Sequence, residues 1–150
     1  MKFIVDPSLD FKIQDAAELA SRFFAVGLLP IKDYPQYTFT NLTSEYVFNL
    51  IASSHMNFEV RVVPWKPKWR FTSAIATTFA SIPNVVHINV YKVKSRSMAD
   101  YVATCVHESL HVMGFEHGSN SGQGKEPKLS SVPIRVAKIA KDWAEQYSRT

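Results

Sequence analysis

The chain has 150 residues, of which 46% are hydrophobic and 20% charged, with one cysteine and a formal net charge of +4. This length and apolar content predict one domain with its own hydrophobic core over residues 1–150. The composition excludes a disordered chain and an internal disulfide framework, and no apolar run is long enough to cross a membrane.

The first residues carry no secretion signal. Residues 1–5, MKFIV, are followed at once by Asp6 and Pro7, so there is no apolar region of the kind that a signal peptide requires. We therefore expect a protein that is cytoplasmic or is released without a classical signal peptide. No feature of the sequence sets the oligomeric state.

The first third of the chain predicts two helices. Residues 7–10, PSLD, open an N-terminal amphipathic helix that closes at Gly27. A second helix is expected over residues 43–54, and a brief strand over residues 37–40. We expect the N-terminal helix to pack against a sheet, and neither helix carries residues for chemistry.

Three strands are predicted before residue 95. Residues 58–63, FEVRVV, form one, and residues 84–94 form another in which Val86, Ile88 and Val90 alternate with polar positions. Residues 74–80 are a third candidate, joined to the strand at 84–94 by a turn-like spacer. The short spacer suggests an antiparallel pair.

Basic and aromatic residues alternate over residues 64–70, PWKPKWR. Such a segment can stack on and neutralise single-stranded nucleic acid, as the positive net charge also suggests. The alternative is a solvated loop whose tryptophans cover part of the core. We favour the loop, because a charge of +4 is modest and the cations are dispersed along the chain.

A longer helix is bounded by its own capping signals. Ser97 and Asp100 are spaced as a capping box, and Gly114 suits the position just past the helix end. A mostly apolar stripe marks the side that faces the core: Met98, Val102, Cys105, Val106, Ser109, Leu110 and Met113. Cys105 on this stripe is expected to act as a buried hydrophobe, and the opposite side is left for a cleft.

The motif HExxHxxGxxH begins inside this helix. His107 and His111 are four residues apart, so their imidazoles project from one face, and the turn at Gly114 brings His117 back toward them. Three neutral imidazoles leave one position of a tetrahedral Zn²⁺ open for water, which is typical of catalytic sites. Glu108 lies about 100° round the helix from His107, where it can reach that water as a general base.

In this motif and in the strands before it, the chain resembles the metzincin clan of zinc peptidases, and its matrixin-like members most closely. The resemblance covers residues 74–118 and implies that His107, His111 and His117 bind zinc while Glu108 polarises the attacking water. It also implies that residues 74–80 are an edge strand that binds the substrate backbone in extended form. The chain would then be a minimal catalytic domain.

The sequence departs from the clan after His117, because no methionine follows there to form the turn that lies beneath the metal. We expect Leu129, in the segment 128–133, to fill the apolar space under the zinc, since an exchange of Leu for Met nearly conserves volume. The residue that stabilises the oxyanion is left open among Tyr91, Tyr101 and Tyr147.

The end of the chain predicts a loop and a helix. Residues 118–128 are rich in Ser, Gly and Asn and form either a plain connector or a lid beside the cleft. Residues 132–147 form a packing helix. The predicted fold is therefore α+β: a twisted mixed sheet with one antiparallel edge strand, an N-terminal helix, an active-site helix and a C-terminal helix.

The sequence is compatible with two functions. The first is a zinc-dependent endopeptidase that hydrolyses peptide bonds by Glu108-assisted attack of a zinc-bound water on an extended peptide or protein substrate. The alternative is a non-catalytic binding or assembly module whose fold is stabilised by the metal. The missing methionine and the unassigned oxyanion donor motivate this alternative.

Overall fold

The computed structural model describes residues 1–64, 76–93, 95–117 and 129–147. The basic and aromatic segment 65–70 and the predicted loop 118–128 lie outside these residues. The elements are, in chain order, β1 (Lys2–Val5), α1 (Phe11–Val26), α2 (Leu29–Lys32), α3 (Ser44–Ser53), β2 (Asn57–Val63), β3 (Ala76–Phe79), β4 (Ile82–Asn89), α4 (Val90–Val93), α5 (Met98–Val112) and α7 (Val132–Tyr147).

The strands form one mixed sheet in the order β1-β2-β4-β3. β1 is parallel to β2, and β2 is parallel to β4. β3 is antiparallel to β4 and forms an edge of the sheet. The predicted fold class, α+β with one antiparallel edge strand, is therefore confirmed, and so is the assignment of that edge to the segment before the turn at residues 80 and 81.

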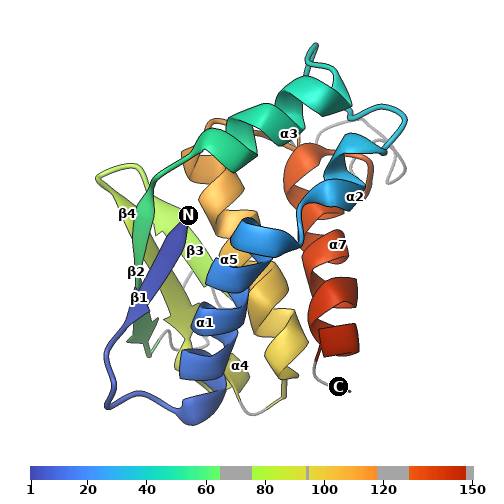
Figure 1. The fold of residues 1–150 in the computed structure, drawn as a ribbon. Helices are drawn as coiled ribbons and strands as arrows, with labels where there is room; N and C mark the ends of the chain where they lie inside the picture. Colours follow the sequence, from blue (N-terminus) through green and yellow to red (C-terminus); the bar gives the residue numbers. More distant parts are fainter. Residues whose placement is uncertain (65–75, 94, 118–128, 148–150) are drawn as a thin grey trace.

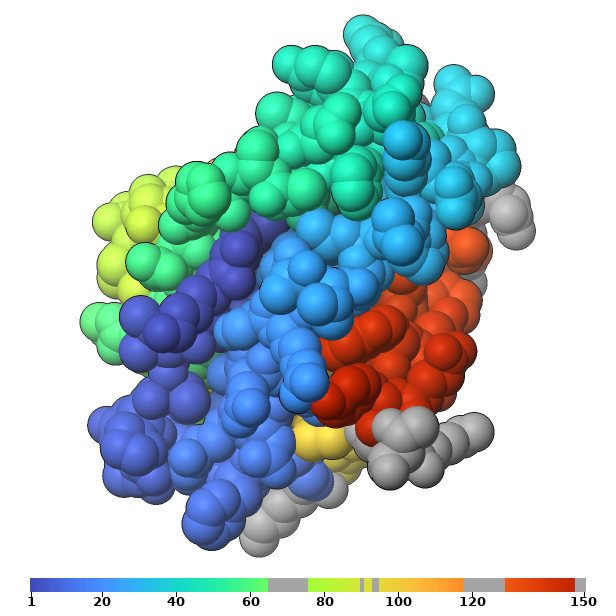
Figure 2. Space-filling model, in the orientation of Figure 1, coloured from blue at the N-terminus to red at the C-terminus, as the bar shows by residue number. Residues whose placement is uncertain are grey.

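Helices cover one face of this sheet (Figure 1). α1 packs on β1, α5 packs on β3 and β4, and α7 packs on both helices on the side away from the sheet. Phe3 of β1 stacks on Phe58 of β2 and on Phe24 of α1, which joins the sheet to the first helix. In the space-filling view, α5 is visible only at its N-terminal end, beneath α1 and α7 (Figure 2). No residue of α5 is exposed, so the helix that carries the motif is enclosed by its neighbours.

Burial follows the predicted periodicities. In β2, Phe58 and Val60 face the helices and are buried, whereas Glu59 and Arg61 are exposed on the other face. α1 begins after Asp10, whose carboxylate caps the helix, and ends at Gly27 as predicted. None of the helices within the described ranges is both long and apolar enough to span a membrane.

Four local expectations need correction or addition. Residues 37–40 do not form a strand, because Thr38 makes only an isolated bridge with Ser131. β4 begins at Ile82 and ends at Asn89, so the last residues of the predicted strand form the short helix α4 instead. The strand β1 and the one-turn helix α2 were not predicted. β1 is only four residues long, too short to show a clear alternation by itself.

Candidate metal centre

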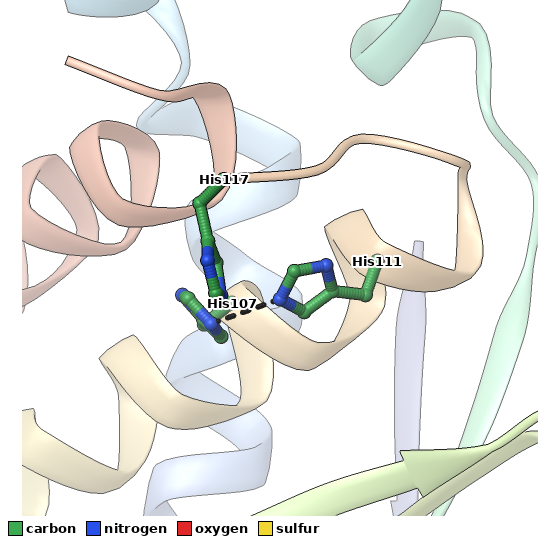
Figure 3. A group of neighbouring side chains, drawn as sticks. All are labelled: His107, His111 and His117. Atoms are coloured by element: carbon green, nitrogen blue, oxygen red, sulfur yellow. Dashed lines mark hydrogen bonds between the residues drawn. The ribbon is translucent and has the colours of Figure 1, made fainter. Parts of the chain in front are cut away.

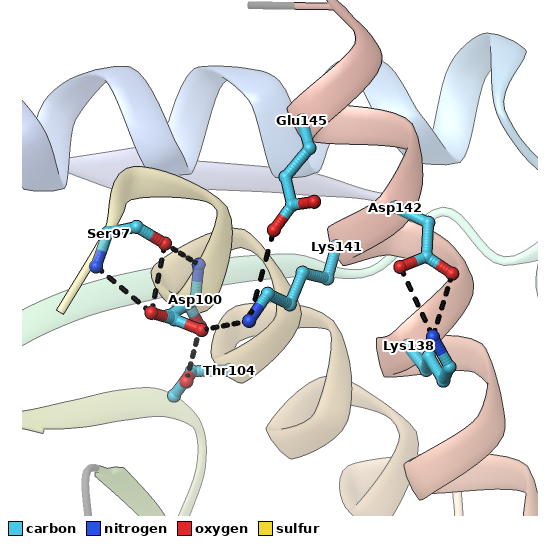
Figure 4. A network of polar contacts seen from close by, with 7 residues as sticks. All are labelled: Ser97, Asp100, Thr104, Lys138, Lys141, Asp142 and Glu145. Atoms are coloured by element: carbon cyan, nitrogen blue, oxygen red, sulfur yellow. Dashed lines mark hydrogen bonds and ion pairs between the residues drawn. The ribbon is translucent and has the colours of Figure 1, made fainter.

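The start of α5 is fixed by a capping box and by an ion pair from α7 (Figure 4). The Asp100 backbone N–H donates to Ser97 Oγ at 3.1 Å, and the Ser97 N–H donates back to Asp100 Oδ2 at 3.0 Å. Lys141 of α7 donates to the other oxygen, Asp100 Oδ1, at 2.7 Å. These contacts fix the first turn of α5 against α7 two turns before the motif begins.

The end of α5 is a Schellman turn. The N–H of Phe115 donates to the Leu110 carbonyl at 3.1 Å, and the N–H of Gly114 donates to the His111 carbonyl at 2.9 Å. Gly114 has a φ of +90°, a conformation that side chains with a Cβ disfavour. The predicted helix stop at Gly114 is confirmed, and the turn reverses the chain toward the motif helix.

This turn brings the three histidines together (Figure 3). His107 Nε2 and His111 Nε2 are 3.1 Å apart, and one ring nitrogen from each of His107, His111 and His117 lies within 4.8 Å of the others. In the described ranges this is the only group of three or more histidine, cysteine or acidic side chains that is close enough to hold a metal ion.

Two of the rings are oriented by backbone carbonyls. His111 Nδ1 donates to the Phe115 carbonyl at 2.8 Å, and the His107 imidazole hydrogen-bonds the backbone of Pro133 in α7. Proline has no N–H, so Pro133 accepts this bond. A neutral imidazole has a single N–H, and each of these two rings directs it to a carbonyl. Because His111 directs its N–H from Nδ1, its Nε2 atom, 3.1 Å from His107 Nε2, carries a lone pair that can bind a metal ion.

His117 is held differently from the other two. Its Nδ1 atom is buried and has no hydrogen-bond partner among the described residues. The position of this ring therefore depends on the turn at Gly114 and on the path of the chain through Glu116. This agrees with the role that the sequence predicts for the turn at Gly114.

The protonation states also suit a metal site. Burial, together with the neighbouring His111 and His117, lowers the pKa of His107 to about 4. Burial likewise lowers the pKa of His111. Both rings are therefore neutral at pH 7, as metal ligation requires. The residues present thus fit a metal ion, which they could hold through three imidazole nitrogens.

Glu108 lies beside the histidines on the sheet side of α5. Its carboxylate accepts a hydrogen bond from the hydroxyl group of Thr78 in β3 at 3.4 Å, and a second bond from the Thr78 backbone. Burial raises the pKa of Glu108 to about 7, although the two bonds from Thr78 oppose this rise. A carboxyl group with this pKa can both accept and release a proton near neutral pH.

A cavity of about 340 Å³ opens next to this carboxylate. Its walls come from β3, α5 and α7, and its lining residues are Ala76, Asp100, Ala103, Thr104, His107, Glu108 and Ala137. Three alanines line it, so its volume results from the small size of these side chains. The cavity extends along α5 from Glu108 toward Asp100, and it leaves room for part of a ligand beside the acid.

The expected role of Leu129 is wrong. Its side chain is 56% exposed, so it does not fill a space beneath the histidines. The first turn of α7 contacts the site instead, through the Pro133 backbone, while Val132 is fully buried. The residue pattern does not predict this contact, because every residue type carries a backbone carbonyl.

The three tyrosines considered as oxyanion donors do not line the cavity beside Glu108. Tyr101 is fully buried in the core, whereas Tyr91 is exposed on α4. Tyr147 stacks on Trp143 and lies under the Arg22 guanidinium. The structure therefore selects none of them.

Comparison with known proteins returns no protein-family model, no curated protein and no solved structure that matches this chain.

Proposed function

We propose that this protein is a zinc-dependent endopeptidase of the metzincin type. The observation that carries the proposal is the convergence of three imidazoles from one helix and its terminal turn, next to a half-buried carboxylate that lines a cavity. His107, His111 and His117 are the proposed metal ligands, and Glu108 is the proposed catalytic residue.

The donor set favours zinc over other divalent ions. Imidazole nitrogen is a preferred zinc ligand, and a set of three leaves one position open. Two nitrogens bound to a tetrahedral zinc lie about 3.3 Å apart, as follows from bond lengths of about 2.05 Å. The separation of 3.1 Å between the Nε2 atoms of His107 and His111 is close to this value. When bound, zinc supplies Lewis acidity, which lowers the pKa of a coordinated water to near 7 and polarises a carbonyl oxygen.

The chain's own residues supply the proton transfers. Glu108 accepts a proton from the attacking water as the water adds to the scissile carbonyl carbon, and then delivers it to the leaving amine. β3 is the last strand of the sheet and lies beside Glu108, and we propose that an extended peptide adds along it as a further strand. The cavity next to Glu108 has room for a substrate side chain.

The Glu108→Gln variant tests this function. We expect it to bind about one zinc per chain, as the wild type does, but to lose cleavage of an unstructured protein substrate by at least about 100-fold, as removal of a general base implies. Metal content is measured by mass spectrometry and cleavage by the appearance of new amino termini. Undiminished cleavage by Glu108→Gln would exclude the role of Glu108.

The second candidate is the non-catalytic module stabilised by a metal. It is favoured by the absence of Tyr91, Tyr101 and Tyr147 from the cavity lining, which leaves the oxyanion donor unassigned. A wild-type protein that binds zinc tightly, yet cleaves nothing in a broad peptide library, would establish this candidate instead. Nucleic-acid binding through residues 65–70 stays a prediction, and salt-dependent binding of single-stranded DNA would test it.

A further inference from the structure

Thr78 holds the carboxylate of Glu108 by two separate groups. Its hydroxyl group donates to Glu108 Oε2 at 3.4 Å, and its backbone also hydrogen-bonds the carboxylate. We propose that Thr78 is a positioning residue that ties the catalytic carboxylate to the substrate-binding edge strand. This inference rests on the proposed peptidase function and adds a residue that the motif does not contain.

The pairing of β3 with β4 is irregular at this residue. Ala76 pairs with Ile88 and Thr77 pairs with His87, but the register shifts between Thr77 and Phe79. Irregularities of this kind often lie next to active sites, where they redirect a side chain. Here the shift occurs at the residue whose hydroxyl and backbone both contact Glu108.

Thr78 lies on the face of β3 that is directed toward α5, whereas the adjacent residues Thr77 and Phe79 lie on the other face. Ala76 lines the cavity on the α5 side, and Thr78, two residues further, contacts Glu108 on that side. Phe79 packs edge-on against His87, which lies opposite Thr77 in β4. Thr77 thus provides a matched control: the same residue type, one position away, whose hydroxyl donates to the Thr78 carbonyl at 3.2 Å rather than to Glu108.

Among the described residues, Thr78 is the only partner that orients Glu108. No other side chain or backbone group in the described ranges donates a hydrogen bond to this carboxylate. A glutamate side chain has three rotatable torsions, and one anchored oxygen removes much of this freedom.

The hydroxyl group is tested by Thr78→Val, which nearly conserves shape, and by Thr78→Ser, which retains the hydroxyl. We expect Thr78→Val to lower kcat about tenfold, the effect of losing about 1.4 kcal/mol of transition-state stabilisation. KM and zinc content should stay close to wild-type values, and Thr78→Ser should recover most of kcat. Thr77→Val should leave kcat and KM unchanged.

Two results would overturn the assignment. An unchanged kcat in Thr78→Val would show that the hydroxyl does not position the base. A similar loss in both Thr78→Val and Thr78→Ser would show that the methyl packing, rather than the hydroxyl, matters at this position.

A measurement without substrate or metal tests the contact by itself. In the metal-free protein, the Thr78 amide should exchange with solvent about tenfold faster in Glu108→Ala than in the wild type, because its acceptor is removed. The Thr77 amide serves as the control. Equal exchange of the Thr78 amide in both proteins would refute the contact. A wild type that cleaves no peptide would instead refute the proposed function, so the two failures are distinct.

Discussion

The carbonyl oxygen of Phe115 lies 2.8 Å from Nδ1 of His111, four residues earlier in the chain. The same residue, Phe115, closes the Schellman turn through its N–H. One turn of backbone therefore ends α5, orients His111 and starts the return of the chain to His117. A local hydrogen-bond pattern thus builds part of the candidate metal centre.

Gly114→Ala tests this relationship. Alanine strains a residue with a φ of +90°, although no neighbouring atom within 4 Å would contact the added Cβ. We expect a loss of about 1 kcal/mol in the free energy of unfolding and a clear fall in zinc affinity, because Phe115 and His117 both follow the turn. Urea unfolding and competition with a chelator measure the two effects. Gly114→Asn should lower the free energy of unfolding and the zinc affinity less than Gly114→Ala does, because asparagine tolerates positive φ. Equal losses in both variants would contradict this account.

The stability of the metal-free protein should fall in mild acid. Burial lowers the pKa of His107 to about 4 in the folded chain, below the value of about 6.5 for an unfolded histidine. Between these values the unfolded chain binds more protons, so stability rises with pH and falls as the pH drops. We expect His107 to contribute a loss of up to about 2 kcal/mol between pH 7 and pH 5. Denaturant unfolding at the two pH values measures it.

His107→Gln provides the comparison for this pH effect, because glutamine does not titrate. Its free energy of unfolding should depend less on pH over the same interval. If the variant and the wild type show the same pH dependence, His107 does not cause the loss.

Asp100→Asn should destabilise the start of α5. Burial alone would raise the pKa of Asp100, but hydrogen bonds from Lys141 and Ser97 outweigh it, so that the pKa lies below its usual value. The contribution is therefore present above about pH 4 and is lost as the pH falls through the lowered pKa. We expect the variant to lose about 1 kcal/mol at pH 7, and the difference from the wild type to shrink as the pH falls through the lowered pKa.

Asp142→Asn is the matched control for Asp100. Asp142 pairs with Lys138 four residues earlier, and both side chains are more than half exposed. Its removal should cost no more than about 0.5 kcal/mol. An effect as large as that of Asp100→Asn would show that burial at the α5–α7 contact is not what distinguishes the two ion pairs.

Ala103→Leu tests whether the cavity beside Glu108 receives a substrate side chain. The larger residue fills part of the 340 Å³ that Ala103 helps to line. We expect kcat/KM to fall at least about tenfold for peptides with a large side chain next to the scissile bond, and much less for those with a small one, at unchanged zinc content. Ala52→Leu, on an exposed position of α3, should change neither value. Equal losses for large and small side chains would exclude the cavity as a selective site.

Elements with strong local signals are predicted correctly from the residue pattern alone. Ser97, Asp100 and Gly114 set the ends of α5 because capping and left-handed turns are local chemistry, and they lie where the structure has them. The spacing of His107 and His111 places both rings on one helix face for the same reason. Periodicity likewise located α1, β2 and α7, whose buried faces repeat over enough residues to be distinct.

Other features depend on contacts between segments that are distant in the sequence. β1 forms because Lys2–Val5 pairs with β2, more than fifty residues later in the chain. No local residue pattern predicts this strand. Two contacts at the site join separate elements. Thr78 of β3 contacts Glu108 of α5 through its hydroxyl and its backbone, and the Pro133 backbone of α7 contacts His107 of α5. The exposure of Leu129 also depends on contacts between distant segments. The packing of α7 on α5 fixes where the residues before α7 lie relative to the histidines, and this packing involves the whole chain.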